Sequence, residues 1–187
     1  MGRNVEIKAK VNNMDRQRGL MEALVGAQPQ VVYQEDTFFN CSAGRLKLRT
    51  TPDGKDELIH YQREDRDEPT ESEYVLSLTN DPDTLKEALS NALGVRAVVR
   101  KNRRVYVVER TRIHLDEVEG LGDFIELEVE LRPGESQETG IEVAQDLMEK
   151  LEIRGEDLVK SAYVDLLESA PGSHSPERMP GRQHENE

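Results

Sequence analysis

A short stretch near the start of the chain, residues 4–11, constrains the fold most, because polar and apolar residues alternate along it without a break. In an extended strand, successive side chains point to opposite faces. One face of this strand therefore carries Val5, Ile7, Ala9 and Val11, and the other carries Asn4, Glu6, Lys8 and Lys10. Such a strand can pack its apolar side outward against helices and turn its charges into a wet interior. Later segments repeat the pattern.

Eight strand-like and four helix-like segments predict an α+β fold. The expected strands are 4–11, 30–40, 45–49, 58–64, 72–79, 95–109, 111–117 and 124–131, and the expected helices are 14–25, 82–93, 138–151 and 155–168. The strands follow one another mostly through turns, which predicts an antiparallel sheet, and eight such strands can close into a barrel. We therefore predict an eight-stranded antiparallel β-barrel, or tunnel, with helices packed on the outside.

The composition of the chain changes after residue 168, where the apolar pattern stops. This change predicts one domain over residues 1–168 and a disordered tail over residues 169–187. Within the domain, the second helix is expected to bury a stripe formed by Leu85, Ala88, Leu89 and Ala92. The single cysteine, Cys41, is expected to be a small buried side chain.

The charge balance limits the classes of partner. The net charge of −13 argues against a general nucleic-acid binder, although a local basic cavity is compatible with it. One cysteine rules out a disulfide framework and a cysteine-based zinc site. No segment resembles a signal peptide, and no apolar run reaches membrane-spanning length, so we expect a cytoplasmic protein with a small-molecule partner. The sequence leaves a homodimer open.

The charged faces of the strands are the candidate functional feature. They carry Glu6, Lys8 and Lys10; Arg45, Lys47 and Arg49; Arg63; Lys101 and Arg103; Arg112, His114 and Asp116; and Glu126, Glu128 and Glu130. If all these faces turn into one barrel, the mixture cannot be buried dry. It suits an anionic ligand together with divalent cations, because Lys and Arg match phosphate oxygens, and carboxylates with phosphates match Mg²⁺ or Mn²⁺.

A plainer interpretation is that each strand simply has one solvated face. The row formed by Glu126, Glu128 and Glu130 speaks against it most clearly, since three like charges on alternate positions repel one another unless cations or bases face them. His60 and His114 are expected to be structural or exposed, because no second histidine lies at ligand spacing. No glycine-rich phosphate loop is present, so any phosphate must be bound by side chains.

These residues together resemble the CYTH domain, also called the triphosphate tunnel metalloenzyme superfamily, which includes class IV adenylyl cyclases, thiamine triphosphatases and inorganic tripolyphosphatases. The family's first strand reads E-x-E-x-K, and this chain has Asn4-x-Glu6-x-Lys8 there. Further matching segments are Gln34–Phe39, Leu46–Arg49, Lys101–Arg103, Leu115–Glu128 and Ser161–Leu167. The resemblance covers roughly residues 3–168, and Leu115–Glu128 is most similar to the cyclase branch.

The resemblance implies an eight-stranded tunnel and assigns roles to its charged side chains. The triphosphate would be gripped by Lys8, Lys10, Lys47, Arg49, Arg63, Lys101 and Arg103, to which the charged faces add Arg112. Mg²⁺ or Mn²⁺ would be held by Glu6, Asp116, Glu126 and Glu128. Glu6, Lys8 and Glu128 would serve catalysis. In a cyclase the ribose 3′-hydroxyl attacks the α-phosphorus of ATP and pyrophosphate leaves; in a triphosphatase water attacks the terminal phosphorus.

One position departs from the family pattern. Asn4 replaces the first glutamate, and its amide oxygen brings no charge to a cation. Three interpretations therefore stay open. The first is an enzyme, either a class IV-like adenylyl cyclase or a hydrolase of tripolyphosphate, thiamine triphosphate or a nucleoside triphosphate. The second is a non-catalytic triphosphate-binding module, and the third is an acidic β-protein that binds a partner through its outer face.

Overall fold

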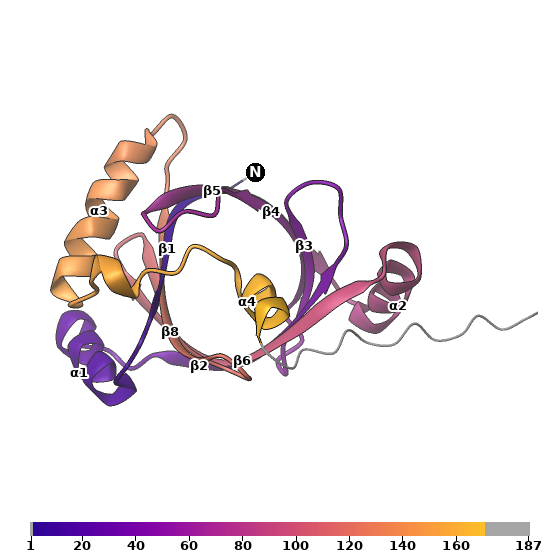
Figure 1. Cartoon of the computed structure of the whole chain (residues 1–187), viewed down its shortest axis with the longest axis horizontal. Coiled ribbons are helices and arrows are strands. Elements are labelled where there is room, and N and C mark those ends of the chain that lie inside the picture. The colour runs from indigo at the N-terminus through magenta and orange to yellow at the C-terminus, as the bar shows by residue number, and fades with distance from the viewer. Residues whose placement is uncertain (1, 171–187) are drawn as a thin grey trace, which may run out of the picture.

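A closed barrel of eight antiparallel strands dominates the computed structural model, which describes residues 2–170 (Figure 1). The strands are β1 (Gly2–Lys10), β2 (Gln30–Phe39), β3 (Arg45–Thr50), β4 (Asp56–Arg63), β5 (Thr70–Thr79), β6 (Val95–Val108), β7 (Thr111–Val118) and β8 (Gly122–Glu130). Around the ring they follow the order β1-β5-β4-β3-β2-β6-β7-β8. The predicted α+β barrel is therefore confirmed.

The N-terminal strand closes the ring. β1 pairs with β5 on one side, where Asn4 lies opposite Ser72, and with β8 on the other, where Glu6 lies opposite Glu128. Residues directly opposite one another on antiparallel strands share a face of the sheet. This register therefore places the charged faces of β1 and β8 on the same side of the wall.

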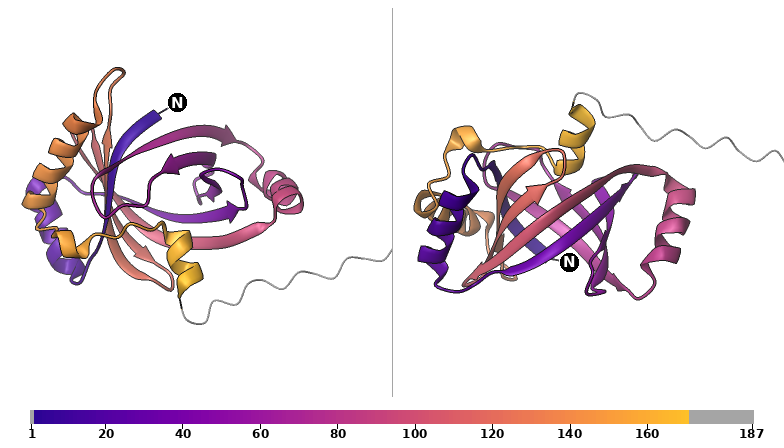
Figure 2. Two further views of the ribbon diagram at one scale, coloured as in Figure 1. Left: turned by 45° about the horizontal axis from the view of Figure 1, so that its top comes forward. Right: turned by 90° about the horizontal axis from the view of Figure 1, so that it is seen from below.

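Four helices lie outside the strands: α1 (Met14–Val25), α2 (Pro82–Leu93), α3 (Gln137–Lys150) and α4 (Tyr163–Ser169). The side chain of Asn13 caps α1 by accepting a hydrogen bond from the Arg16 backbone N–H, and Gly26 ends it in the left-handed region at φ 66°. α1 and α3 lie side by side against one side of the barrel, and α2 lies at the opposite side (Figure 2).

The main core lies between the barrel and the helices α1 and α3. Ile7 and Ala9 of β1 are buried there against Met21 of α1 and Leu147 of α3. The apolar side of β1 thus faces outward into the helices, as its alternation predicts. Gly140 lets α3 approach closely, since a Cβ atom at this position would lie 2.6 Å from Cγ2 of Val5.

The helix predicted over residues 155–168 is wrong. A 3₁₀ turn (Gly155–Asp157) is followed by an extended segment, 158–162, and only then by α4. The segment crosses one end of the barrel (Figure 1) and forms a bridge between Leu158 and Ala9. The Val159 N–H donates to the Lys8 carbonyl at 2.8 Å, so pairing with the free end of β1 replaces the local helical hydrogen bonds.

Three smaller expectations also need correction. None of the α2 side chains is buried: Leu85 and Leu89 are half-buried, and Ala88 and Ala92 are exposed, because α2 lies at the edge of the barrel, mainly against β2 and β3. Cys41 is exposed in the loop between β2 and β3. Ser169 belongs to α4, and the rest of the predicted tail, from residue 171, lies outside the described residues. Within residues 2–170, no helix is long and apolar enough to cross a membrane.

Candidate active site

The barrel encloses a cavity of about 470 Å³. Its basic lining residues include Lys8, Lys47, Arg49, Arg63, Lys101, Arg103 and Arg112, and its acidic lining residues include Glu6, Asp36, Glu126 and Glu128. These side chains come from seven strands that are far apart in the sequence. The structure therefore brings most of the predicted site residues into one interior space.

Two predicted site residues do not line this cavity. Lys10 is exposed at the last position of β1. Asp116 is fully buried behind the cavity wall. It accepts hydrogen bonds from Arg103 Nε at 2.7 Å and from the Tyr163 hydroxyl at 2.9 Å. Asp116 thus orients Arg103, and its oxygens are not free to hold a metal.

The basic side of the cavity is organised around Asp36 on β2. This carboxylate accepts hydrogen bonds from Lys47 Nζ at 2.9 Å and from Arg49 Nε at 2.8 Å. Lys101 Nζ lies 3.9 Å away. Burial alone would raise the pKa of Asp36, but Arg49, Lys47 and Lys101 outweigh it and hold this pKa well below its usual range. One carboxylate thus holds three bases in place and leaves an excess of positive charge for an anion.

The same crowding acts on the lysines. Burial, with Arg103 nearby, lowers the pKa of Lys101 to about 7. Burial and Arg49 lower the pKa of Lys47. Since burial and neighbouring positive charges disfavour the charged form of a lysine, an anion bound among these residues would restore it.

The acidic side lies where β1, β8 and β7 run next to one another. The register sets Lys8 opposite Glu126 on one side of β8 and His114 opposite Glu126 on the other. Lys8 Nζ lies 2.8 Å from Glu126 Oε1, and Arg103 also pairs with Glu126. Glu128 accepts a hydrogen bond from Arg112 Nε at 3.0 Å.

These contacts set the ionisation of the three glutamates. Burial opposes ionisation of Glu126, but Lys8 and Arg103 hold its pKa well below the usual range. For Glu128 burial is likewise outweighed, by His114, Arg112 and Arg103, and its pKa falls to about 2. Glu6 behaves in the opposite way, because burial and the adjacent Glu128 raise its pKa to about 7, against the effect of Arg63. The acidic side of the cavity therefore holds two ionised carboxylates, Glu126 and Glu128, and one, Glu6, that titrates near neutral pH.

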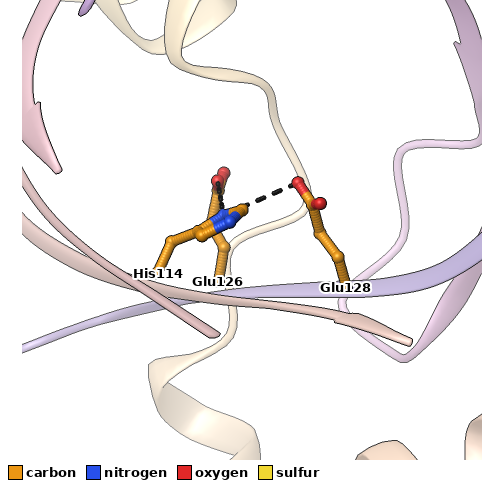
Figure 3. A group of neighbouring side chains, drawn as sticks. All are labelled: His114, Glu126 and Glu128. Atoms are coloured by element: carbon orange, nitrogen blue, oxygen red, sulfur yellow. Dashed lines mark ion pairs between the residues drawn. The ribbon is translucent and has the colours of Figure 1, made fainter. Parts of the chain in front are cut away.

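The acidic side also contains a group of side chains that fits a divalent cation. One ligand atom each of His114, Glu126 and Glu128 lies within 4.8 Å of the others, and the three side chains converge on one point (Figure 3). His114 Nδ1 is buried and has no hydrogen-bond partner within residues 2–170. The same holds for Asn4 Oδ1, a further cavity-lining oxygen. His114 Nδ1 and Asn4 Oδ1 thus offer free lone pairs beside the ionised carboxylates of Glu126 and Glu128, and such a set of donor atoms fits a divalent cation.

Asp36, His114 and Tyr163 also line the cavity, although none of them was predicted as a site residue. The sequence alone favours a structural or exposed His114, because no second histidine lies near it, and its place opposite Glu126 emerges only from the strand register. Tyr163, at the start of α4, closes one end of the cavity. Lys8 Nζ lies 4.1 Å and Lys101 Nζ 5.0 Å from its ring centroid, so the ring supports two of the bases by cation–π contacts.

Comparisons with known proteins agree with this geometry. The sequence pattern of the CYTH domain matches residues 2–163. A protein of Methanocaldococcus jannaschii, named "Putative adenylate cyclase", is 22% identical over 169 residues, which cover 87% of this chain and 97% of that protein.

Solved structures share the fold. A protein from Pyrococcus horikoshii is 26% identical and superposes with a TM-score of 0.79, covering 87% of this chain and 98% of its own. A "Putative adenylyl cyclase" from Hippeastrum, described as revealing a dominant triphosphatase activity, is 18% identical with a TM-score of 0.64, covering 94% of this chain and 100% of its own. Enzymes of the CYTH family are typically metal-dependent and act on triphosphates. Because the family pattern spans nearly all of the described barrel, the chain belongs to the CYTH domain family.

Proposed function

We propose that this protein is a metal-dependent enzyme that binds ATP by its triphosphate inside the barrel and converts it to cyclic AMP and pyrophosphate. The observation that carries the proposal is the division of one 470 Å³ cavity into a basic side and a carboxylate side. A triphosphate with a bound cation has the matching charge distribution. The similarity of Leu115–Glu128 to the cyclase branch, and the name of the Methanocaldococcus relative, favour cyclisation.

In this proposal the basic side chains bind and orient the phosphates. Lys8 and Lys101 lie over the Tyr163 ring, and Lys101 also lies with Lys47 and Arg49 around Asp36. Binding the triphosphate along this row of bases would hold the α-phosphorus at a defined place, and most of the catalysis of phosphoryl transfer comes from such positioning and charge stabilisation. A bound Mg²⁺ or Mn²⁺ would neutralise phosphate charge and polarise the phosphorus under attack. Glu126 and Glu128, with the amide oxygen of Asn4 nearby, would hold it.

Glu6 is the side chain best suited to accept the proton of the attacking hydroxyl. Its pKa of about 7 lets it be ionised before the reaction and protonated after it near neutral pH. In the step itself, the ribose 3′-oxygen forms a bond to the α-phosphorus, the bond from that phosphorus to the bridging oxygen breaks, and pyrophosphate leaves with the electron pair. The proton of the hydroxyl passes to Glu6.

Hydrolysis of a triphosphate is the second candidate function. The same base could take a proton from water, and the Hippeastrum protein associates triphosphatase activity with this fold. A third candidate, binding without turnover, is motivated by Asn4, which gives the site one negative charge fewer than the family pattern.

A panel of substrates tests the three candidates side by side. Purified protein is incubated with ATP, tripolyphosphate and thiamine triphosphate, each with Mg²⁺ and with Mn²⁺, and the products are identified by chromatography. Cyclic AMP with pyrophosphate supports the proposal, and release of inorganic phosphate supports hydrolysis. Tight binding of a triphosphate without any product supports the third candidate, binding without turnover. Arg103→Ala and Glu128→Gln should reduce any turnover, the first through phosphate binding and the second through the metal-dependent rate.

A further inference from the structure

His114 lies between the carboxylates of Glu126 and Glu128. Lys8 and Arg103 already pair with Glu126, and Arg112 pairs with Glu128, so neither carboxylate needs His114 as a partner. It is 4% exposed, and its Nδ1 atom has no hydrogen-bond partner among the described residues. Leaving a buried polar nitrogen unpaired is unfavourable, because the atom loses its hydrogen bond to water and gains none in the protein. The surrounding barrel wall fixes the side chain nonetheless, since His114 sits in the middle of β7, paired with β6 and β8.

The distances around this nitrogen are those of ligands that share an ion. Nδ1 lies 3.7 Å from Glu126 Oε2 and 3.6 Å from Glu128 Oε1 (Figure 3). Both separations are too long for hydrogen bonds. Ligand atoms about 2.0–2.2 Å from one metal ion lie roughly 3.0–3.5 Å from each other in tetrahedral or octahedral geometry. The two distances from Nδ1 exceed this range by only a few tenths of an ångström, and the whole group lies within 4.8 Å, so an inward movement of the side chains would let all three atoms meet one ion.

We infer that His114 is a metal ligand that, with Glu126 and Glu128, makes this cation site prefer a transition-metal dication over Mg²⁺. The chemical reason is the donor set. Carboxylate oxygens alone suit Mg²⁺, whereas an imidazole nitrogen suits the first-row transition metals and is a poor ligand for a cation that demands oxygen. The inference rests on the proposed function in one respect, since it concerns the cation of the same site, but it needs no turnover to be tested.

Mn²⁺ is the probe of choice, because its unpaired electrons report directly on a bound nitrogen. Pulsed electron paramagnetic resonance of the full chain with one equivalent of Mn²⁺ should show a nitrogen coupling typical of coordinated imidazole. His114→Gln should abolish it. His60→Gln is the matched control: His60 lies on β4, outside the cavity lining, with Nε2 3.0 Å from the Ala43 carbonyl. That variant should keep the coupling.

Calorimetric titration gives the selectivity. His114→Gln should weaken Mn²⁺ binding about 10-fold or more, since even the loss of an outer-sphere partner costs a metal site about that much. Mg²⁺ binding should change much less, so the ratio of the two dissociation constants should collapse. His60→Gln should leave both unchanged.

A wild-type spectrum without nitrogen coupling, or with a coupling that survives in His114→Gln, overturns the inference, and so does an unchanged Mn²⁺/Mg²⁺ ratio. The wild-type spectrum decides the matter even if His114→Gln does not fold, which melting curves would reveal. If the protein turns over no triphosphate yet shows the nitrogen coupling, the proposed function fails and the metal assignment stands. If it turns over ATP with Mg²⁺ and shows no coupling, the assignment fails and the function stands.

Discussion

At the scale of single residues, the site is a set of charges that hold one another in place. Asp36 holds Lys47 and Arg49, and Asp116 holds Arg103. Glu6 has a weaker partner, since Arg63 Nη1 lies 3.7 Å from its nearer oxygen. The Oδ1 atom of Asn4 has no hydrogen-bond partner in the part of the chain that the structure describes. These two positions on β1 are therefore where the charge of the site can be adjusted most readily.

Asn4→Glu should restore the charge of the family pattern. We expect Mg²⁺ and Mn²⁺ to bind about 10-fold more tightly, because one more carboxylate faces the cation. Without metal the variant should be less stable than wild type, since its new charge lies close to Glu6 and Glu128, whose mutual repulsion already raises the pKa of Glu6. Calorimetric titration and metal-free melting curves measure the two effects.

Asn4→Gln is the neutral control and should produce neither change. Weaker metal binding by Asn4→Glu would mean that the side chain of residue 4 does not reach the cation.

Glu6 should make the metal-free protein less stable as pH rises. Its folded pKa of about 7 lies above the unfolded value of 4.5, so its contribution is intact below pH 4.5, declines as pH rises between 4.5 and 7, and is lost above. Glu6→Gln removes this loss. The stability of Glu6→Gln relative to wild type should therefore increase from pH 5 to pH 8. We expect a gain of about 2 kcal/mol in the free energy of unfolding once solvent screening of the partly exposed carboxyl is allowed for, and melting curves at the two pH values measure it. A difference that stays constant with pH would contradict this assignment.

At the scale of elements, the position of α3 depends on one small residue. Gly140 faces β1, and a Cβ atom there would lie 2.6 Å from Val5 Cγ2 and 2.8 Å from Leu131 Cδ2. Both neighbours are buried, and Val5 has a stiff, branched side chain.

Gly140→Ala should therefore destabilise the protein. Overpacking a buried contact costs about 1–3 kcal/mol, which exceeds the gain of up to about 1 kcal/mol from alanine in a helix. The melting temperature measures the net loss. Gly19→Ala in α1 is the control, because a Cβ atom at this position meets nothing within 4 Å, and it should stabilise slightly. An increase for Gly140→Ala as well would show that α3 can move away from β1 at little cost.

The elements also show where sequence reasoning succeeded and where it could not. The alternation of β1 and β8 predicted which face turns inward, because in a two-sided wall the apolar face must meet the helices. The periodicity of residues 155–168 wrongly predicted one long helix. Leu158 and Val159 pair with β1 instead, and a contact so distant in the sequence leaves no trace in the local pattern. Lys10 has the right phase but is the last residue of β1 and is exposed. His114 needed the strand register, which only the closed barrel supplies.

At the scale of the whole molecule, a net charge of −13 surrounds a cavity with an excess of bases. The local field inside the barrel, not the total charge, then decides what binds.

Tripolyphosphate with Mg²⁺ should therefore raise the melting temperature despite the acidic surface. At a concentration 100 times its dissociation constant, a ligand stabilises the folded state by about 2.7 kcal/mol, which corresponds to about 5–10 °C for a chain of this length. Lys8→Ala should reduce the increase at a fixed concentration, because a buried charged donor is worth about 1.5–3 kcal/mol. Thermal-shift measurements check both.

Lys10→Ala is the matched control, since Lys10 follows on the same strand but is exposed outside the cavity. It should respond to tripolyphosphate like wild type. Equal increases in melting temperature for wild type, Lys8→Ala and Lys10→Ala would mean that tripolyphosphate binds elsewhere on the molecule.

Closure of the ring by β1 has a consequence for how the protein folds. The first strand must find β8, more than a hundred residues further along the chain, before the barrel is complete. Contacts so distant in sequence slow folding, because the entropy of closing a large loop is lost before the pairing gains anything. Glu6, Glu126 and Glu128 all lie at this junction. Glu6 and Lys8 come from β1, so a half-folded chain with every other strand in place would still lack both side chains, and tripolyphosphate binding should report on the last step of assembly.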